Sequence, residues 1–321
     1  MSAFQKLSDF IDESLSEVIR HTEKPDNLFH YTSQSAFQSI VSKGELWLTN
    51  VRTMNDPWEG SFGVAVIRRL LAKFPDKYPN LIDIVERSYS NNSFYVDEFL
   101  KYRRPTYLMS FSRQPDFLPD WINYGANGSG LCVQFPREKL VPAIVEILQE
   151  KPFVALFPVF YFSQDEIGAN DENKDFVSAL YTMADKIEDL VDHEPDGSAQ
   201  VLKPLALDAF MIFAVMIKSV FHQAENEWRL IVRQTGDDNT ENIDSVMLGQ
   251  SLRTIYKIHF PDRRLGESPL TVNQLGSIID VVFTGPKLRN SGIEQAIWML
   301  TLKRWKKGVR ILPSDGALVP D

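Results

Sequence analysis

The sequence predicts an α+β fold, and three observations support this prediction. Short β-rich runs and helical runs are both present, but they do not alternate strictly, as they would in a doubly wound parallel sheet. No internal repeat or low-complexity linker divides the 321 residues. The composition, 44% apolar and 24% charged, is that of an ordinary folded protein, and a chain of this length buries roughly three quarters of its surface. We therefore expect one elaborated domain over residues 1–321.

Hydrophobic periodicity gives the order of the elements. The first half is expected to contain a helix at 4–21, a strand at 28–32, a helix from Ser33 or Ser35 to Gly44, a strand at 46–48, two helices within 64–102, and strands at 106–112 and 131–135. The second half is expected to contain a helix at 137–150, a strand at 154–162 interrupted by Pro158, a helix in an acidic stretch, a helix at 204–221, strands at 227–232, 252–260 and 280–284, and a helix that runs from a capping box at Ser291 and Glu294 to Trp305. Two segments, 64–104 and 163–221, are expected to be helical insertions in the core.

Charge is distributed unevenly along the chain, which has 34 Lys and Arg residues against 43 Asp and Glu residues and a formal charge of −9. Eleven acidic residues and two lysines lie between Asp165 and Asp196. We interpret this region as a partner surface or a lid. Seven basic residues and one glutamate lie between Lys287 and Arg310. This second region is either a solvated helix face and tail or a surface for nucleic acid or a phosphorylated ligand.

Several features favour a cytoplasmic protein without a membrane segment. The single cysteine, Cys132, cannot form an intramolecular disulfide, which fits a reducing compartment. The N-terminus lacks the apolar run of a signal peptide, and the longest apolar run, 209–217, is too short to span a bilayer. The five histidines are too widely spaced for a local metal site, and the common nucleotide-binding and protease motifs are missing.

Five polar clusters lie at expected strand ends and in loops, where functional sites are often built. They are His30-Tyr31-Thr32-Ser33, Asn55-Asp56-Pro57-Trp58-Glu59, Ser110-Phe111-Ser112, Trp121-Ile122-Asn123-Tyr124-Gly125 and Glu225-Asn226-Glu227-Trp228-Arg229-Leu230. Each also has a purely structural interpretation, such as a packed histidine, an Asx-turn or a surface ion pair. The glycines between Gly125 and Gly130 indicate a tight turn that leads into a strand, because no helix follows them as a dinucleotide loop requires.

The last cluster gives the most specific prediction. If residues 225–232 are extended, alternation places Glu225, Glu227 and Arg229 on one face and apolar side chains on the other. Two neighbouring carboxylates can hold a sugar hydroxyl and stabilise a developing oxocarbenium ion. A surface ion pair is the alternative interpretation.

Taken together, these segments resemble a bacterial family known as domain of unknown function 2971. The resemblance runs in order through F-H-Y-T at 29–32, L-W-L-T-N at 46–50, M-N-D-P-W-E at 54–59, S-F-S at 110–112, W-I-N-Y at 121–124, G-L-C-V-Q-F at 130–135, E-N-E-W-R-L at 225–230 and V-V-F-T-G-P at 281–286. Members commonly carry a histidine shortly before the glycine at position 130, where this chain has Asn127-Gly128-Ser129.

More distantly, the same order of parts resembles the ADP-ribosyltransferase fold, which implies a split β-sheet core and NAD as a substrate, with no permanently bound cofactor. In that fold, Glu227 would anchor the nicotinamide ribose and stabilise the oxocarbenium ion, and Glu225 would orient the acceptor. The other residues implied to contact NAD are His30, Tyr31, Thr32, Asn55, Asp56, Glu59, Ser110, Ser112, Trp121, Tyr124 and Arg229. His30 and Glu227 are expected to border one common cavity.

The resemblance thus implies an NAD-consuming ADP-ribosyltransferase or NAD glycohydrolase, for which a bacterial toxin or a phage-defence effector would be a typical setting. The acceptor would be a protein, a nucleic acid or water. Two alternatives remain at this point: a nucleotide sensor or interaction protein that keeps the fold without catalysis, and a nucleic-acid-processing enzyme that uses the basic region.

Overall fold

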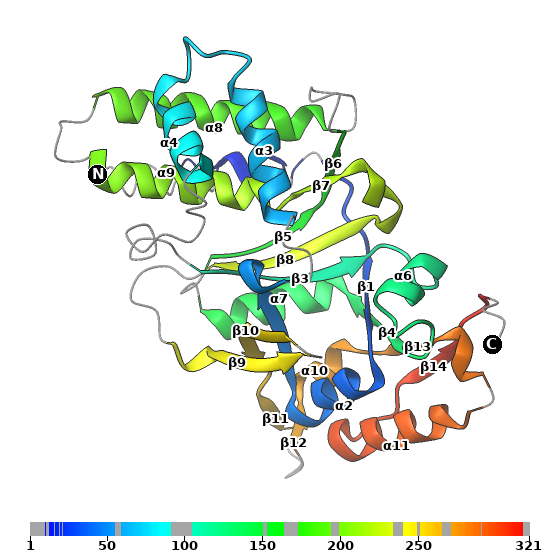
Figure 1. Cartoon of the computed structure of the whole chain (residues 1–321). Coiled ribbons are helices and arrows are strands. Elements are labelled where there is room, and N and C mark those ends of the chain that lie inside the picture. The colour runs from blue at the N-terminus through cyan, green and yellow to red at the C-terminus, as the bar shows by residue number, and fades with distance from the viewer. Residues whose placement is uncertain are drawn as a thin grey trace. The chain divides into compact units, whose positions relative to one another are not determined.

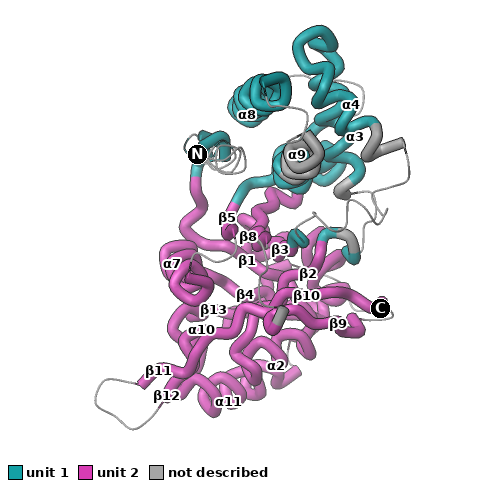
Figure 2. Tube along the Cα trace, turned by 90° about the vertical axis from the view of Figure 1, so that its left-hand side faces the viewer, with its two compact units in different colours: residues 1–23, 51–106, 157–224 teal, residues 24–50, 107–156, 225–321 magenta. Residues whose placement is uncertain are grey.

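The structure is a computed structural model. It describes residues 10, 13–15, 17–18, 20, 22–54, 59–90, 105–149, 153–163, 173–193, 199–233, 240–248, 251–264, 271–289 and 291–316. The chain divides into two compact units, each assembled from segments that are distant in sequence (Figure 2). Unit 1 comprises residues 1–23, 51–106 and 157–224, and unit 2 comprises residues 24–50, 107–156 and 225–321.

Unit 2 is built on a large, mostly antiparallel sheet, which confirms the α+β prediction (Figure 1). Its described strands are β1 (Asn27–Thr32), β2 (Glu45–Asn50), β3 (Thr106–Ser112), β4 (Leu131–Pro136), β5 (Phe153–Pro158), β8 (Glu227–Arg233), β9 (Ile243–Leu248), β10 (Ser251–His259), β13 (Val281–Thr284) and β14 (Arg310–Pro313). The order along the main path is β14-β13-β4-β1-β3-β2-β10-β9, and β8 pairs with β3 and β5 beside this path. Among the strand pairs of this sheet whose register is described, only β13 and β14 run parallel to each other.

Strand β3 is the branch point of the sheet, because it pairs with β1, β2 and β8. It meets β1 at a single residue pair, Phe29 with Ser112. It meets β2 near its other end, where Tyr107 pairs with Asn50. Three of the polar clusters of the sequence therefore lie on the adjacent strands β1, β3 and β8.

The two faces of this sheet carry different cores. The larger core contains Leu28 of β1, Phe111 of β3 and Trp228 of β8. It is covered by residues of α2 (Gln34–Lys43), α7 (Arg137–Leu148), α10 (Gln274–Ile278) and α11 (Ile293–Trp305). The smaller core on the opposite face contains Phe29, Tyr31, Cys132 and Trp121, which belongs to the short helix α6 (Leu118–Asn123). We call this opposite side the α6 face.

Unit 1 is mainly helical. Its described elements are α3 (Glu59–Leu71), α4 (Pro79–Ser90), α8 (Lys174–His193), α9 (Ala199–Ala214) and the parallel pair β6 (Phe160–Phe162) and β7 (Ile217–Ser219). Residues 10, 13–15, 17–18 and 20 are helical as well, within the helix expected at 4–21. Both expected insertions, 64–104 and 163–221, fall within the segments of unit 1. That the whole chain acts as one domain stays a prediction.

Helix α4 begins at a cap that another helix supplies. Pro79 has no N–H group, and the N–H groups of Asn80 and Leu81 donate to the two carboxylate oxygens of Glu188 in α8, at 2.8 and 3.0 Å. The N–H group of Tyr78 donates to the carbonyl oxygen of Phe74. The first donors of α4, which have no partner inside a helix, are thus all satisfied.

Two expected helix boundaries are wrong. The helix expected at 204–221 ends at Ala214, because residues 217–219 pair with β6 and this pairing prevails over the apolar run. The capping box at Ser291 does not form. Gly292 is the N-cap residue of α11, and the Ser291 hydroxyl donates to the carbonyl oxygen of Leu288 at the end of the preceding turn.

Candidate functional site

Four of the expected site residues share the α6 face. On β8, Trp228 lies in the larger core, so alternation places Glu227 and Arg229 on the opposite side. On β3, Phe111 lies in the larger core, so Ser110 and Ser112 face the opposite side as well. The spacing of the two serines predicts that they share a face, and the spacing of Glu227 and Arg229 predicts the same for that pair.

Glu225 reaches the same region by a different route from the one expected. It is the last residue of the 3-10 helix η3 (Val220–Glu225), and Asn226 has a left-handed φ of 44°, so Glu225 is not part of an extended run with Glu227. The backbone carbonyl of Glu225 accepts a hydrogen bond from the Ser112 hydroxyl at 3.3 Å. Its carboxylate oxygen Oε1 accepts one from the Tyr124 hydroxyl at 3.0 Å. The structure thus brings Ser112, Tyr124 and Glu225 together.

Glu227 and Arg229 form a buried ion pair. The Nε and Nη2 atoms of Arg229 donate to the two carboxylate oxygens of Glu227 at 2.8 and 3.0 Å. The side chain of Glu227 is only 5% exposed, and that of Arg229 is only 1% exposed. The surface ion pair considered from the sequence is therefore a pair inside the protein, and it fixes the orientation of the carboxylate.

The imidazole of His30 lies on the other side of the sheet. His30 alternates with Phe29 and Tyr31, and its ring packs edge-on against Phe111 with centroids 5.9 Å apart. Its Nδ1 atom is 3.0 Å from the carbonyl oxygen of Ser110, close to the point where β1 and β3 stop pairing. Burial lowers the pKa of His30 below its ordinary value, although the hydrogen bond opposes this. Alternation places Thr32 on the same side as His30, so the structure does not bring these two side chains to the face that carries Glu227.

Tyr31 and Trp121 form the interior support of α6. Their rings pack edge to face with centroids 4.9 Å apart, and Trp121 has no exposed surface. The hydroxyl of Tyr31 donates to the carbonyl oxygen of Gln114 and accepts from the N–H group of Phe117, each at 2.9 Å. Burial raises the pKa of Tyr31 strongly. Both rings hold the helix in place, whereas Tyr124 at its end is 47% exposed.

Asp116 is a member of this region that the sequence did not indicate. Its Oδ1 atom accepts hydrogen bonds from Trp121 Nε1 and from the Ser314 hydroxyl, both at 2.5 Å. Its Oδ2 atom accepts from the N–H group of Asp315 at 2.7 Å. The segment that follows β14 is thus fastened to α6. The only signal in the sequence is the position of Asp116 in a turn directly before the helix.

The glycine cluster forms a tight turn between α6 and β4, as expected. Ala126, Asn127 and Gly128 are all in the left-handed region. A Cβ atom at Gly130 would lie 2.3 Å from the carbonyl oxygen of Thr32, so only glycine fits beside β1 at this point. This turn therefore joins Tyr124, at the end of α6, directly to the start of β4.

The remaining candidates give less information. Asn55 and Asp56 lie outside the described residues. Glu59 is the first residue of α3, but its side chain lies outside the described part. Within the parts of the chain that are described, no three His, Cys, Asp or Glu side chains are grouped to hold a metal ion.

Comparison with known protein families gives a match to part of the chain. Residues 121–230 match the sequence model of a family described as protein of unknown function (DUF2971). The matched stretch begins at Trp121 and ends at Leu230, so it contains Tyr124, Glu225 and Glu227 but neither His30 nor Ser112. No curated protein and no solved structure matches the chain. In the described part of the chain, every helix is too short or too polar to cross a bilayer.

Proposed function

We propose that this protein breaks the nicotinamide–ribose bond of NAD, as an ADP-ribosyltransferase or as an NAD glycohydrolase. The observation that carries this proposal is the contact between Tyr124 and Glu225. The half-exposed Tyr124 is hydrogen-bonded to the carboxylate of Glu225. A second carboxylate, that of Glu227 on the α6 face, follows two residues later in the chain. An aromatic ring can pack on a planar nicotinamide ring, and a nearby carboxylate can stabilise the positive charge that develops on the attached ribose.

The chemistry requires a negative group close to the ribose. When the bond breaks, nicotinamide leaves with the bonding electron pair, and positive charge develops on the ribosyl carbon. A carboxylate that is already oriented favours this charge more than it favours the neutral ribose, and so lowers the barrier. Arg229 orients Glu227, while Ser112 and Tyr124 orient Glu225. In this proposal Glu227 stabilises the ribosyl cation, Glu225 orients the acceptor or water that attacks it, and Tyr124 packs on nicotinamide.

A second candidate function is nucleotide binding without catalysis. It is favoured by the ion pair of Glu227, because Arg229 balances the charge that the reaction would use. In this case the chain would bind NAD or a related nucleotide reversibly as a sensor or an interaction protein.

The first test measures nicotinamide release. The purified full-length protein is incubated with NAD labelled in the adenine half, with and without cell lysate. Free nicotinamide together with a labelled macromolecule supports a transferase, and free nicotinamide with ADP-ribose supports a glycohydrolase. If NAD binds but neither product forms under any of these conditions, the chain is a binding protein and the enzymatic proposal is wrong.

Variants then assign the roles. We expect Glu225→Gln and Glu227→Gln to lower the rate by about 10²-fold or more. We expect Tyr124→Phe to lower it about tenfold, since it removes one hydrogen bond. Glu227→Gln also removes the negative charge of a buried ion pair and so lowers stability, whereas Glu225→Gln does not alter that pair and is therefore the more informative variant. Glu138→Gln, an exposed position of α7, is the matched control and should keep the wild-type rate.

A further inference from the structure

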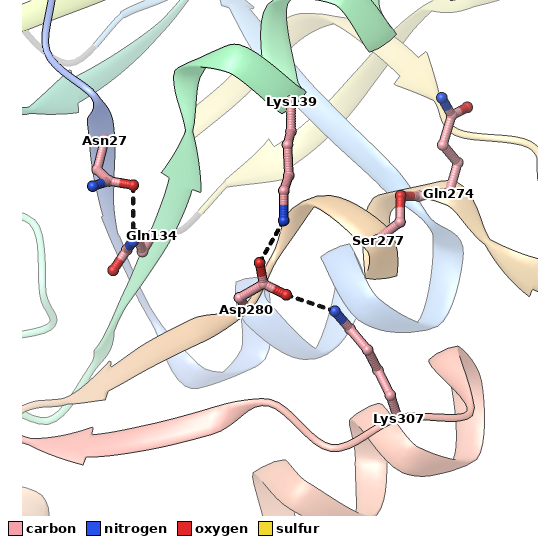
Figure 3. Close-up of polar contacts among 7 residues, drawn as sticks. All are labelled: Asn27, Gln134, Lys139, Gln274, Ser277, Asp280 and Lys307. Carbon is pink, nitrogen blue, oxygen red and sulfur yellow. Dashed lines mark hydrogen bonds and ion pairs between the residues drawn. The ribbon is translucent and has the colours of Figure 1, made fainter.

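A group of positive charges meets around Asp280 in unit 2. Figure 3 shows Lys139, near the start of α7, and Lys307, just after α11, approaching the carboxylate of Asp280 from two sides. Each Nζ atom is 2.7 Å from a different oxygen of this carboxylate. Partial burial raises the pKa of Asp280, but the two lysines outweigh this effect and hold it below its ordinary value. Two ammonium groups thus share one ionised carboxylate, and one positive charge is left over.

Three further cations extend this group. Lys303, Lys306 and Arg310 are exposed, and no carboxylate in the described part of the chain lies within ion-pair distance of them. The backbone N–H group of Arg310 donates to the carbonyl oxygen of Asp280 at 2.9 Å, which places this residue beside the two lysines. We call Lys139, Lys303, Lys306, Lys307 and Arg310 the cationic patch.

The helix dipole explains only part of this patch. Cations are favoured in the last turn of a helix, which accounts for Lys303 in α11. Lys139 and Arg310 come from other elements, α7 and β14, and converge on the same place. Although the chain has a formal charge of −9, these cations create a positive surface potential at one place, and such a potential attracts an anionic partner.

An exposed indole borders the patch. Trp298 of α11 is 45% exposed, and the next residue, Met299, is 53% exposed. A Cβ atom at Gly308 would lie 2.1 Å from Trp298 Nε1, so the indole packs against the backbone between Lys307 and Arg310. The opposite side of α11 is not available, because Ile297 and Trp305 are buried in the larger core.

We propose that the cationic patch and Trp298 bind single-stranded nucleic acid. The ammonium and guanidinium groups would contact successive phosphates, and an unpaired base would stack on the indole. This combination separates the proposal from a membrane surface, where a helix presents a broad apolar face, because α11 exposes little apolar surface beyond Trp298 and Met299. The proposal does not depend on NAD cleavage.

The test measures the affinity of the full-length protein for fluorescent single-stranded RNA and DNA of roughly 16 nucleotides, the upper site size of such surfaces, over a series of salt concentrations. We expect binding that weakens with salt. The triple variant Lys303→Ala/Lys306→Ala/Arg310→Ala should lose at least about tenfold in affinity, and its logarithmic salt slope should be smaller by about 2. Trp298→Ala should bind about tenfold more weakly with an unchanged slope, because stacking involves no counterion release.

Two controls make the result specific. Lys24→Ala/Lys43→Ala removes exposed lysines elsewhere in unit 2, and Leu252→Ala removes an exposed apolar side chain of β10. Both should bind as the wild type does. The proposal is wrong if no salt-sensitive binding occurs, if the control variants lose as much affinity as the patch variants, or if Trp298→Ala has no effect. Preferential binding to phosphatidylserine vesicles would equally overturn it in favour of a membrane surface.

Discussion

His30 is held as a neutral imidazole at the point where β1 and β3 separate. A carbonyl oxygen can only accept, so the Nδ1 atom that lies 3.0 Å from Ser110 O must carry a proton. The other nitrogen carries a second proton only when the ring is charged, and burial disfavours this state. His30 therefore adds a side-chain contact beside the single residue pair that joins β1 and β3, and the cost of charging its buried ring makes stability depend on pH.

The pH dependence of stability tests this view of His30. Its pKa in the folded protein lies below the ordinary value of 6.5, so its contribution is present above pH 6.5 and is lost as the pH falls through the lowered pKa. We expect the free energy of unfolding of the wild type to fall on acidification relative to His30→Asn, whose amide can keep the hydrogen bond but does not titrate. Urea denaturation at several pH values measures this difference.

The pKa of His193 is shifted in the opposite direction to that of His30. This residue is exposed at the end of α8, and its hydrogen bond to the carbonyl oxygen of Asp189, together with the nearby carboxylate, raises its pKa. Its contribution is present below pH 6.5 and is lost as the pH rises through the raised pKa. Equal pH profiles for wild type and His30→Asn would contradict the assignment of a lowered pKa to His30.

Alternation along strands predicted single side chains well, and irregular backbone did not. Phe111 and the pair Glu227 and Arg229 occupy the faces that a period of two predicts, because burial of one face fixes the other. Glu225 departs from the pattern because of the left-handed Asn226, a conformation that the sequence does not announce. The contact between Tyr124 and Glu225 joins residues 101 positions apart, so no local pattern could predict it.

At the level of elements, helix α8 supplies carboxylates to α4. Besides the two backbone contacts of Glu188, Asp185 accepts from the Tyr78 hydroxyl at 2.6 Å, and Asp192 accepts from the Asn80 amide at 2.7 Å. These acidic residues of the 165–196 region thus serve contacts within unit 1. The expectation that the region also meets a partner stays a prediction.

Removing the cap should measure its value. We expect Glu188→Ala to lower the free energy of unfolding by about 2 kcal/mol, because one buried and one partly buried N–H group at the start of α4 lose their acceptor. Asp189→Ala, an exposed neighbour in α8, should change it by less than about 0.5 kcal/mol. Chemical denaturation of both variants makes the comparison. Equal effects of the two substitutions would show that the Glu188 contacts contribute nothing beyond a surface charge.

Long, strongly periodic elements were predictable, and short ones were not. α2, α7 and α8 and the strands β1, β3, β4 and β8 lie close to their expected positions, since each buries one regular face. The sequence did not indicate β7, β9, β11 (Asp262–Arg264), β12 (Thr271–Asn273), β14, α6 and α10. All of these are only three to six residues long, and pairing or packing with distant residues fixes them.

For the whole molecule, the decisive feature is where the chain leaves and re-enters unit 2. The segment 51–106 starts after Asn50 and ends before Tyr107, and these two residues are direct partners across β2 and β3. The segment 157–224 starts within β5 and ends just before β8, and these strands also pair with each other. Unit 2 thus needs neither segment to connect its strands.

Unit 2 should therefore fold without unit 1. We expect a protein in which a two-residue hairpin turn replaces 51–106 and a Gly-rich linker of about eight residues replaces 157–224 to keep a cooperatively folded sheet. Dispersed amide resonances and a sharp denaturation curve would confirm this. Removal of 51–106 alone should be more harmful, because α3 and α4 pack with α8 and α9. A double deletion that lacks resonance dispersion would contradict the expectation.

The same geometry bears on how such a chain changes over evolutionary time. Either excursion can lengthen, shrink or be exchanged by insertion and deletion at a single place, without any strand being rethreaded. Homologues should accordingly differ most in length between Asn50 and Tyr107 and between β5 and β8, while the spacing from Tyr107 to β5 stays nearly constant. These two junctions are also where a foreign peptide could be grafted with the least disturbance.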